Sequence, residues 1–339
     1  RGVRGAAVSD GAPVSDGAAV SDGAAVSEGA PVSDPAAPRS YHGQPVIKAP
    51  VWSWEIPWYF YAGGVAGASA GLALGAGARG NDVLARRAWG CAMAGLTISP
   101  ALLISDLGVP RRFVNMLRMF KVTSPMSVGS WVLSVSGAST AVAALHAWTG
   151  LLPGPARAAR PVAALFGLPL STYTAALIAD TSVPVWHEAR QELPFVFGSG
   201  AAMSAGAAAV ITTPVEHAAP ARRLALAGAA LELASKTRME RRLGEHGEAY
   251  RQGTSGTLSK LGDALIAGGA ALLVARGRSR TGAAVAGALL SAGAAGTRWS
   301  VFKAGARSAA DPKYVVGPQR ERIESGVSAG AARTEPRST

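Results

Sequence analysis

Residues 51–78 read VWSWEIPWYFYAGGVAGASAGLALGAGA, and residues 98–131 read ISPALLISDLGVPRRFVNMLRMFKVTSPMSVGSW. One apolar segment opens just after Glu55, a second ends at Asp106, and a third begins near Ser127. A chain that crosses a bilayer, returns and enters again brings these three positions to the same membrane face. The two stretches therefore predict a membrane protein with a cluster of polar residues at one face.

The composition supports a membrane location. The chain is 49% hydrophobic and 16% charged, whereas soluble domains carry about 25% charged residues. The apolar residues come in blocks of about 20, the length that spans a bilayer core. The 42 glycines fall largely among Ala and Ser in these blocks, which favours closely packed membrane helices. We expect an all-α integral membrane protein.

Eight segments are long and apolar enough to be predicted as spans. They cover residues 58–78, 88–107, 127–149, 161–182, 195–213, 221–235, 259–275 and 282–299. The sixth is the weakest, and its Glu232 is either a functional residue inside the membrane or a sign that the predicted boundary is wrong. Asp263 is predicted to open the seventh span and to stabilise its positive N-terminal end.

An even number of spans places both termini on the same side of the membrane. Lys and Arg near the chain ends favour the cytoplasmic side of the plasma membrane for them. The formal net charge of +12 fits basic loops beside anionic lipid rather than nucleic-acid binding.

The two ends of the chain differ from the predicted membrane domain at 41–309. Residues 6–35 repeat a hexapeptide as AAVSDG, APVSDG, AAVSDG, AAVSEG and APVSDP. Such a unit cannot bury a core, so we expect residues 1–40 to form a disordered tail, as a spacer rather than a binding segment. Residues 310–339 are also expected to be disordered.

Redox centres held by this chain are not expected. Cys91 is the single cysteine, so an iron–sulfur cluster lacks its thiolates. His146 alone among five histidines is expected inside a span, whereas bis-histidine haem ligation needs two. The sequence also has no nucleophile motif and no phosphate-binding loop. We therefore expect no haem, no iron–sulfur cluster and no metal site.

The predicted crossing pattern brings many polar residues to one face. They are Glu55, Tyr59, Asp106, Arg111, Asn115, Ser127, Ser130, Trp131, Tyr173, Asp180, Trp186, His187 and Glu188. A ring of exposed ion pairs that only closes loops is the favoured interpretation for Arg111, Arg112 and Glu188. A functional role is favoured for Asp106 and Tyr173, because a phenol two turns inside a span needs a hydrogen-bond partner.

Four segments resemble one protein family. They are WEIPWYFYAGG at 54–64, SDLGVPRRFVNMLR at 105–118, SPMSVGSW at 124–131 and STYTAALIADTSVPVW at 171–186. In this order they are similar to the membrane subunits of the polysulfide reductase, or NrfD-like, family. The resemblance covers residues 41–310; its motifs lie in the first four spans, and the last four share mainly hydropathy.

The resemblance implies eight helices in two four-helix bundles, without haem. It implies menaquinone or ubiquinone at one membrane face, and electron exchange with a separate iron–sulfur subunit, often beside a molybdopterin-type catalytic subunit. The matching quinone-site positions are Tyr59, Gly63 and Tyr173. Asp106 matches a proton-route carboxylate, and we expect Arg111 to tune it. The first span has Ala62 and glycines where better-known members carry amide or imidazole side chains.

Two other functions remain open at this stage. A non-redox transporter built from two four-helix halves predicts matching broken helices in both halves. Polar residues concentrated in the first half argue against it. A plain membrane anchor is the other alternative.

Overall fold

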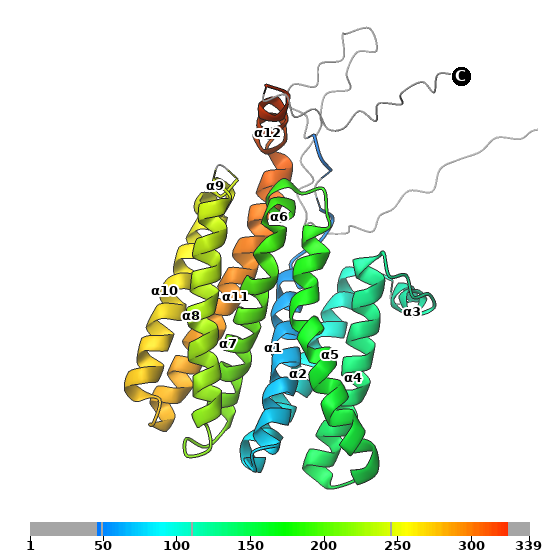
Figure 1. Cartoon of the computed structure of the whole chain (residues 1–339), viewed down its shortest axis with the longest axis vertical. Coiled ribbons are helices and arrows are strands. Elements are labelled where there is room, and N and C mark those ends of the chain that lie inside the picture. The colour runs from blue at the N-terminus through cyan, green and yellow to red at the C-terminus, as the bar shows by residue number, and fades with distance from the viewer. Residues whose placement is uncertain (1–45, 49, 110, 245, 325–339) are drawn as a thin grey trace, which may run out of the picture. The chain divides into compact units, whose positions relative to one another are not determined.

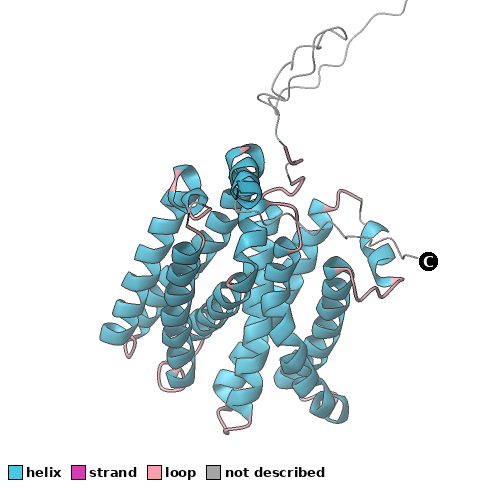
Figure 2. Cartoon of the chain, turned by 45° about the horizontal axis from the view of Figure 1, so that its top comes forward, coloured by secondary structure: helices cyan, strands magenta, loops and turns pink. Residues whose placement is uncertain are grey.

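The structure is a computed structural model that describes residues 46–324, apart from residues 49, 110 and 245. Within that part of the chain the residues form helices and connecting loops, without strands (Figures 1 and 2). The all-α prediction is confirmed there. The hexapeptide array and the end of the C-terminal tail lie outside the described residues.

Eight described helices contain 20 residues or more, and each overlaps one predicted span. They are α1 (Glu55–Gly77), α2 (Asp82–Asp106), α4 (Pro125–Thr149), α5 (Pro153–Ala179), α7 (Leu193–Thr212), α8 (Ala219–Arg242), α10 (Gly253–Arg276) and α11 (Arg280–Ala310). Shorter helices lie between or after them: α3 (Arg111–Leu117), α6 (Pro184–Glu188), η1 (Ala189–Gln191), α9 (Glu248–Arg251) and α12 (Lys313–Glu324).

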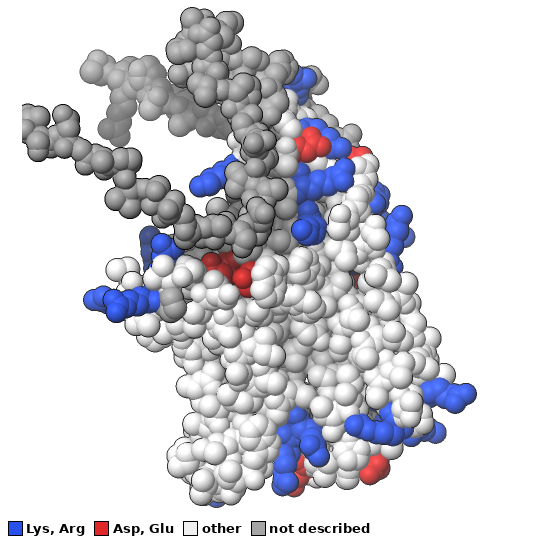
Figure 3. All heavy atoms as spheres, turned by 180° about the vertical axis from the view of Figure 1, so that it is seen from behind, with Lys and Arg blue, Asp and Glu red and all other residues white. Residues whose placement is uncertain are grey.

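Five of the long helices, α2, α4, α5, α7 and α10, are long and apolar enough to cross a membrane. The other three long helices, α1, α8 and α11, are less apolar. Glycines and tyrosines lower the hydropathy of α1, while α8 and α11 carry charged side chains such as Glu232 and Arg298. On the side seen in Figure 3, charged side chains gather toward the two ends of the helices, and a broad uncharged band separates them. Such a band is the surface that a bilayer core covers.

Local sequence fixes where several long helices begin and end. The side chains of Asn81, Ser124 and Ser279 accept hydrogen bonds from the first turns of α2, α4 and α11. These caps satisfy backbone N–H groups that have no partner within the helix. Gly150 ends α4 in the left-handed conformation, which glycine adopts without steric cost.

Glycines set the closest helix contacts, as the composition predicts. Helix α1 packs against α2, α5, α7 and α11, while α7 packs against α8 and α10 against α11. At the α1–α5 crossing, a Cβ on Gly67 would lie 2.2 Å from the Gly167 carbonyl oxygen, and the reverse distance is 2.4 Å. At the α7–α8 crossing, a Cβ on Gly228 would lie 2.4 Å from the Met203 nitrogen. At the α1–α5 crossing the backbones touch because neither glycine carries a side chain, and at the α7–α8 crossing Gly228 lets α8 approach the backbone of Met203.

Helical structure continues beyond two predicted boundaries near the C-terminus. Helix α11 continues past the predicted end at residue 299 to Ala310, because Trp186 donates from Nε1 to the Val301 carbonyl at 2.8 Å and packs on this last part. The tail expected to be disordered contains α12, where Tyr314 is buried and Lys313 Nζ lies 2.7 Å from a Glu248 oxygen. These contacts give residues 313–324 a surface to fold against.

The predicted position of Asp263 is wrong. Helix α10 begins at Gly253, so Asp263 lies almost three turns inside it. Its carboxylate contacts Lys236 rather than the helix terminus. The polar residues before it, GTSGTLSK, already form helix.

Candidate functional site

A cavity of about 70 Å³ lies where α1, α2, α4 and α5 meet the short helix α3. Its lining residues are Trp52, Ile56, Tyr59, Leu103, Asp106, Leu107, Met116, Met126, Ser130, Tyr173 and Leu177. The structure thus brings together three residues predicted from sequence: Tyr59, Asp106 and Tyr173. They come from three different helices, and the walls around them are largely apolar.

The Gly67–Gly167 contact positions the two tyrosines. Helices α1 and α5 cross there backbone to backbone. Tyr59 lies about two turns before Gly67, and Tyr173 lies less than two turns after Gly167. Because the helices run in opposite directions, both tyrosines lie on the same side of the crossing. Their rings meet edge to face, with centroids 6.5 Å apart and planes at 75°.

A third glycine makes room for the Tyr173 ring. A Cβ on Gly129 of α4 would lie 2.2 Å from Cε2 and 2.7 Å from Cδ2 of Tyr173. Any side chain at this position would displace the ring, so the glycine holds the phenol against the cavity wall. The SPMSVGSW segment at 124–131 therefore contributes Gly129, which leaves space for the Tyr173 ring, as well as the lining residue Ser130.

The Tyr59 hydroxyl is a buried polar group without a partner. The residue is 2% exposed, and its hydroxyl has no hydrogen bond in the structure. A buried, unsatisfied hydroxyl costs about 1–3 kcal/mol, and such groups in native proteins call for an explanation. A ligand oxygen in the adjoining cavity would supply the missing partner.

Two carboxylates share one serine at the edge of this cavity. The Ser53 hydroxyl lies 2.8 Å from Glu55 Oε2 and 3.1 Å from Asp106 Oδ1, and the Ser53 backbone N–H donates to Asp106 at 3.2 Å. Ser105 Oγ reaches the other Glu55 oxygen at 3.4 Å. One hydroxyl has one proton, so it can donate to only one carboxylate at a time. The group forms a short chain along which a proton can move.

Glu55 lies before the predicted first span, at the start of α1. The hydrogen bond from the Ser53 hydroxyl, followed by one from the residue's own backbone N–H, lowers the pKa of Glu55 below its ordinary value. The carboxylate is therefore ionised at neutral pH.

Two predicted site residues do not reach the cavity. Gly63 faces α2 instead, where an added Cβ would make ordinary contact with Ser99 Oγ at 3.6 Å. Arg111 begins α3 with an exposed side chain, and the ion pairs found within the described residues do not include it. Helix α3 contributes Met116 to the cavity.

Other polar residues at this end close loops. The Ser127 hydroxyl donates to the Met119 carbonyl at 2.9 Å and accepts from the Lys121 N–H at 3.0 Å. Arg112 donates to the Leu107 carbonyl at 3.3 Å. These contacts fit the loop-closing interpretation of this basic segment.

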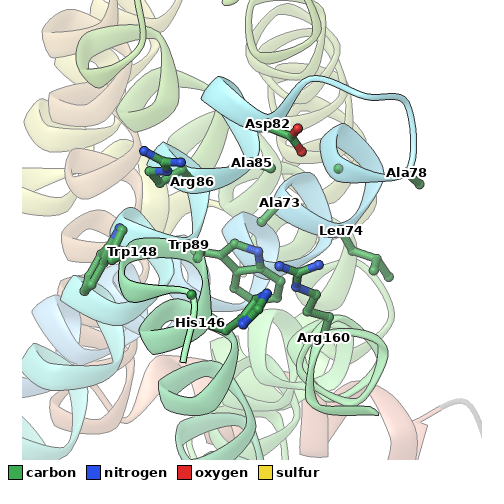
Figure 4. Close-up of a pocket in the computed structure, with 13 residues that line it drawn as sticks. Ala73, Leu74, Ala78, Asp82, Ala85, Arg86, Trp89, His146, Trp148 and Arg160 are labelled. Atoms are coloured by element: carbon green, nitrogen blue, oxygen red, sulfur yellow. The ribbon is translucent and has the colours of Figure 1, made fainter. Parts of the chain in front are cut away.

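A larger cavity, of about 560 Å³, lies at the opposite ends of the same helices. Figure 4 shows Trp89, His146 and Arg160 turned toward one another in it, with Arg86 and Asp82 nearby. Arg160 Nε is buried without a hydrogen-bond partner, and His146 Nδ1 lies 2.8 Å from the Leu151 carbonyl. The sequence did not predict this cavity, because Arg86 and Arg160 lie just outside the predicted spans at 88–107 and 161–182.

A comparison with protein families identifies the chain. The family described as polysulfide reductase, of the NrfD type, matches residues 39–311. The chain belongs to this family. The resemblance seen in four short segments is therefore confirmed over most of the chain. A search of curated proteins finds no match.

Family membership and the apolar helices together make the chain a multi-pass membrane protein. Polysulfide reductase proteins of this type are membrane subunits that work with other redox subunits. The membership thus indicates a membrane subunit of a redox complex.

If a quinone ring occupied the smaller cavity, the lining would offer it hydrogen bonds, apolar contacts and groups that take protons. Two phenols can bond ring oxygens, leucine and methionine side chains can contact the ring, and a hydroxyl–carboxylate chain can take protons. Its volume is smaller than the 150 Å³ or so of a cavity that holds benzene. A ring would enter only if part of the lining moved outward.

Proposed function

We propose that this chain is the quinone-binding membrane subunit of an oxidoreductase complex. In this proposal all eight long helices cross the plasma membrane as two four-helix bundles, one of α1, α2, α4 and α5 and one of α7, α8, α10 and α11. Both termini face the cytoplasm. The observation that carries the proposal is the buried, unpartnered Tyr59 hydroxyl beside Tyr173 and the Ser53-bridged carboxylates.

In this proposal some residues bind the quinone ring and others transfer protons. When bound, menaquinol or ubiquinol supplies two electrons and two protons. Tyr59 and Tyr173 hold the ring oxygens by hydrogen bonds, and Asp106 takes a proton at its carboxylate. Ser53 passes protons between Asp106 and Glu55, since its hydroxyl can donate to one carboxylate while accepting from the other, protonated one.

Helix α3 is the wall that we expect to move. It has seven residues and none of them is buried, yet its Met116 lines the cavity. Few apolar contacts hold such a segment, so displacing it costs little free energy. Outward movement of α3 would enlarge the cavity while α1, α4 and α5 keep the tyrosines in place.

The electrons leave to another subunit in this proposal. The single cysteine cannot hold an iron–sulfur cluster, so a separate iron–sulfur subunit accepts them and a molybdopterin-type subunit is the expected catalytic partner. Arg111, Arg112 and Arg118 are exposed beside the cavity. They offer a basic surface to an acidic partner.

Three variants of the assembled complex test the site. Tyr59→Phe and Tyr173→Phe each remove one hydroxyl, at a cost of about 1–3 kcal/mol, so quinone binding should weaken roughly ten-fold to a hundred-fold. Asp106→Asn keeps size and polarity but removes the titratable proton, so quinol oxidation should slow while binding is kept. Titration with a quinone analogue and steady-state turnover measure the two effects.

Controls on the opposite side complete the test. Arg79→Gln and Arg157→Gln alter exposed residues at the other ends of the helices and should change neither quantity. If all three site variants bind and oxidise quinol like the parent, this cavity is not the quinone site.

Photoaffinity labelling distinguishes the two cavities directly. An azido-quinone bound at the proposed site should label peptides from 52–59, 103–130 or 173–177. Label confined to peptides 73–89 and 146–160 would put the quinone in the larger cavity of Figure 4 instead.

A further inference from the structure

A charged pair lies deep among α7, α8, α10 and α11, outside the lining of the two cavities described above. Glu232 of α8 is fully buried and Arg298 of α11 is 2% exposed. Their closest N–O distance is 3.7 Å, longer than a hydrogen bond. Both Glu232 oxygens, as well as Nε and Nη1 of Arg298, lack hydrogen-bond partners. Glu232 lies well inside helix α8 rather than at its end.

Arg298 is held firmly, whereas Glu232 is not. Arg298 Nη2 donates to the Phe197 carbonyl at 2.9 Å, and its guanidinium lies 4.3 Å from the centroid of the Phe197 ring. Gly200, one turn further along α7, leaves the space that both charged groups use: a Cβ there would lie 2.6 Å from Arg298 Nη2 and from Glu232 Oε2. Neither oxygen of the Glu232 carboxyl group accepts a hydrogen bond in the structure.

Opposing effects act on a carboxyl group in this position. An ionised carboxylate buried without hydrogen bonds is strongly unfavourable, but the nearby guanidinium offsets part of that cost. A protonated carboxyl avoids the cost and leaves Arg298 with its carbonyl and ring contacts. The protonation of Glu232 therefore depends on the balance between burial and the Arg298 charge.

A row of ionisable residues joins Glu232 to the end of the helices. Lys236 follows one turn later on α8, is 3% exposed, and donates to Asp263 at 2.6 Å and to the Ser259 carbonyl at 3.2 Å. Glu240 follows after one more turn and is partly exposed. Residues four apart lie on one face of a helix, so the row leads from the buried pair to the surface.

The row opens at the same end as the smaller cavity. Helix α8 ends at Arg242, which bonds Glu192 at the start of α7 and the Glu188 carbonyl of α6. Trp186 of α6 stacks on Trp52, whose side chain lines that cavity, at 5.8 Å between ring centroids.

We propose that Glu232 is a proton-binding site, with Arg298 as its fixed counter-charge and the Lys236–Asp263 pair as its connection to the helix end. The proposal goes beyond quinone binding and does not depend on it. Lys236 gives a proton to the Glu232 carboxylate and becomes a neutral amine, which then takes a proton from solution through Asp263 or Glu240. Release follows the same steps in reverse.

The charged and titratable groups that act on this pair come from several helices. Arg298 comes from α11, Lys236 from α8 itself and Asp263 from α10, and all three act on Glu232. Tyr61 of α1 acts on Arg298. Helix α7 contributes the Phe197 carbonyl and ring but no charge. Glu232 is therefore the acid that two cations and one more distant carboxylate control.

Infrared difference spectroscopy of the full chain in lipid nanodiscs tests the proposal. Spectra recorded at acidic and alkaline pH should differ by a carbonyl band of a protonated carboxylic acid in a dry site, and Glu232→Gln should abolish that band. Lys236→Met should keep the band and slow its appearance after a pH jump several-fold. Thr237→Val, on an exposed part of the same turn, is the matched control and should change neither.

A second variant covers the case in which Glu232→Gln does not fold, because it leaves Arg298 buried without its counter-charge. The double variant Glu232→Gln/Arg298→Gln removes both charges together and should also lack the band. If the parent and the double variant give the same pH difference spectrum, Glu232 does not titrate, the pair is a permanent structural ion pair, and the proposal is wrong. This outcome would leave the quinone assignment untouched.

Discussion

Gly129→Ala is the sharpest test of how the tyrosine site is built. The added Cβ would lie 2.2 Å from Cε2 of Tyr173, so the ring must withdraw by about 1.2 Å to reach an ordinary contact of 3.4 Å. Overpacking of this kind costs about 1–3 kcal/mol. The displaced phenol would also lose its position toward a quinone oxygen. We expect both a lower thermal unfolding temperature and weaker quinone binding.

Gly137→Ala is the matched control for this experiment. Gly137 lies about two turns further along α4, and an added Cβ there would meet nothing within 4 Å. Replacing a glycine inside a helix by alanine then stabilises by about 0.4–1 kcal/mol. The two substitutions are chemically identical, so the difference between their unfolding temperatures isolates the contact with Tyr173.

A double-mutant cycle measures the contact between residue 129 and the Tyr173 ring directly. In a Tyr173→Ala background the added methyl group meets no ring, so Gly129→Ala should cost nothing there. Unfolding in detergent, followed by intrinsic tryptophan fluorescence, gives all the values needed. If Gly129→Ala is as well tolerated as Gly137→Ala in the parent chain, the Tyr173 ring does not lie over Gly129 and the reconstruction of the cavity wall is wrong.

Three further outcomes follow from single contacts. Gly305→Ala should lower stability by about 1–3 kcal/mol, measured by thermal unfolding, because its Cβ would lie 1.9 Å from the Trp186 ring. Tyr59→Phe should leave the unfolding temperature of the quinone-free protein unchanged or higher, since it removes an unsatisfied hydroxyl; a marked loss would mean that the hydroxyl already has a partner. The hydrogen bond from Lys313 lowers the pKa of Glu248, so the carboxylate stabilises the fold above its ordinary value of 4.5 and this contribution is lost as the pH falls through the lowered pKa. Unfolding curves of Glu248→Gln should therefore differ slightly from the parent at neutral pH and coincide with it at strongly acidic pH.

The sequence predicts the helices and part of the site for a clear physical reason. Blocks of bilayer length locate the long helices, and alternating crossings bring Tyr59, Asp106 and Tyr173 to one end. Hydropathy does not give the rotation of a helix about its axis, so Gly63, one turn from Tyr59, is predicted at the cavity but faces Ser99 of α2. Rotation depends on which backbones touch.

Hydrogen bonds and ion pairs between residues far apart in the chain also cannot be predicted from the sequence. Ser53 lies outside the first helix, just before it, yet it joins Glu55 to Asp106 across a long stretch of chain. Glu232 and Arg298 are visible as charges inside apolar segments, but their pairing depends on how α8 and α11 pack beside α7. A charge inside an apolar segment is thus a signal that a partner exists, without saying which residue it is.

The distribution of polar groups also bears on the transporter alternative. A transporter with two equivalent halves needs matching broken helices, where freed backbone groups bind the substrate. Within the described residues, prolines interior to long helices occur in α2 and α5, at Pro100, Pro161 and Pro169, whereas α7, α8, α10 and α11 have none.

The second group of helices does contain buried charges, contrary to the expectation that polar residues concentrate in the first. However, those charges lie in unbroken helices, and neither of the two cavities described above is lined by Glu232 or Arg298. The two proposals therefore assign different tasks to the two groups of helices: ring binding to the first and proton exchange to the second.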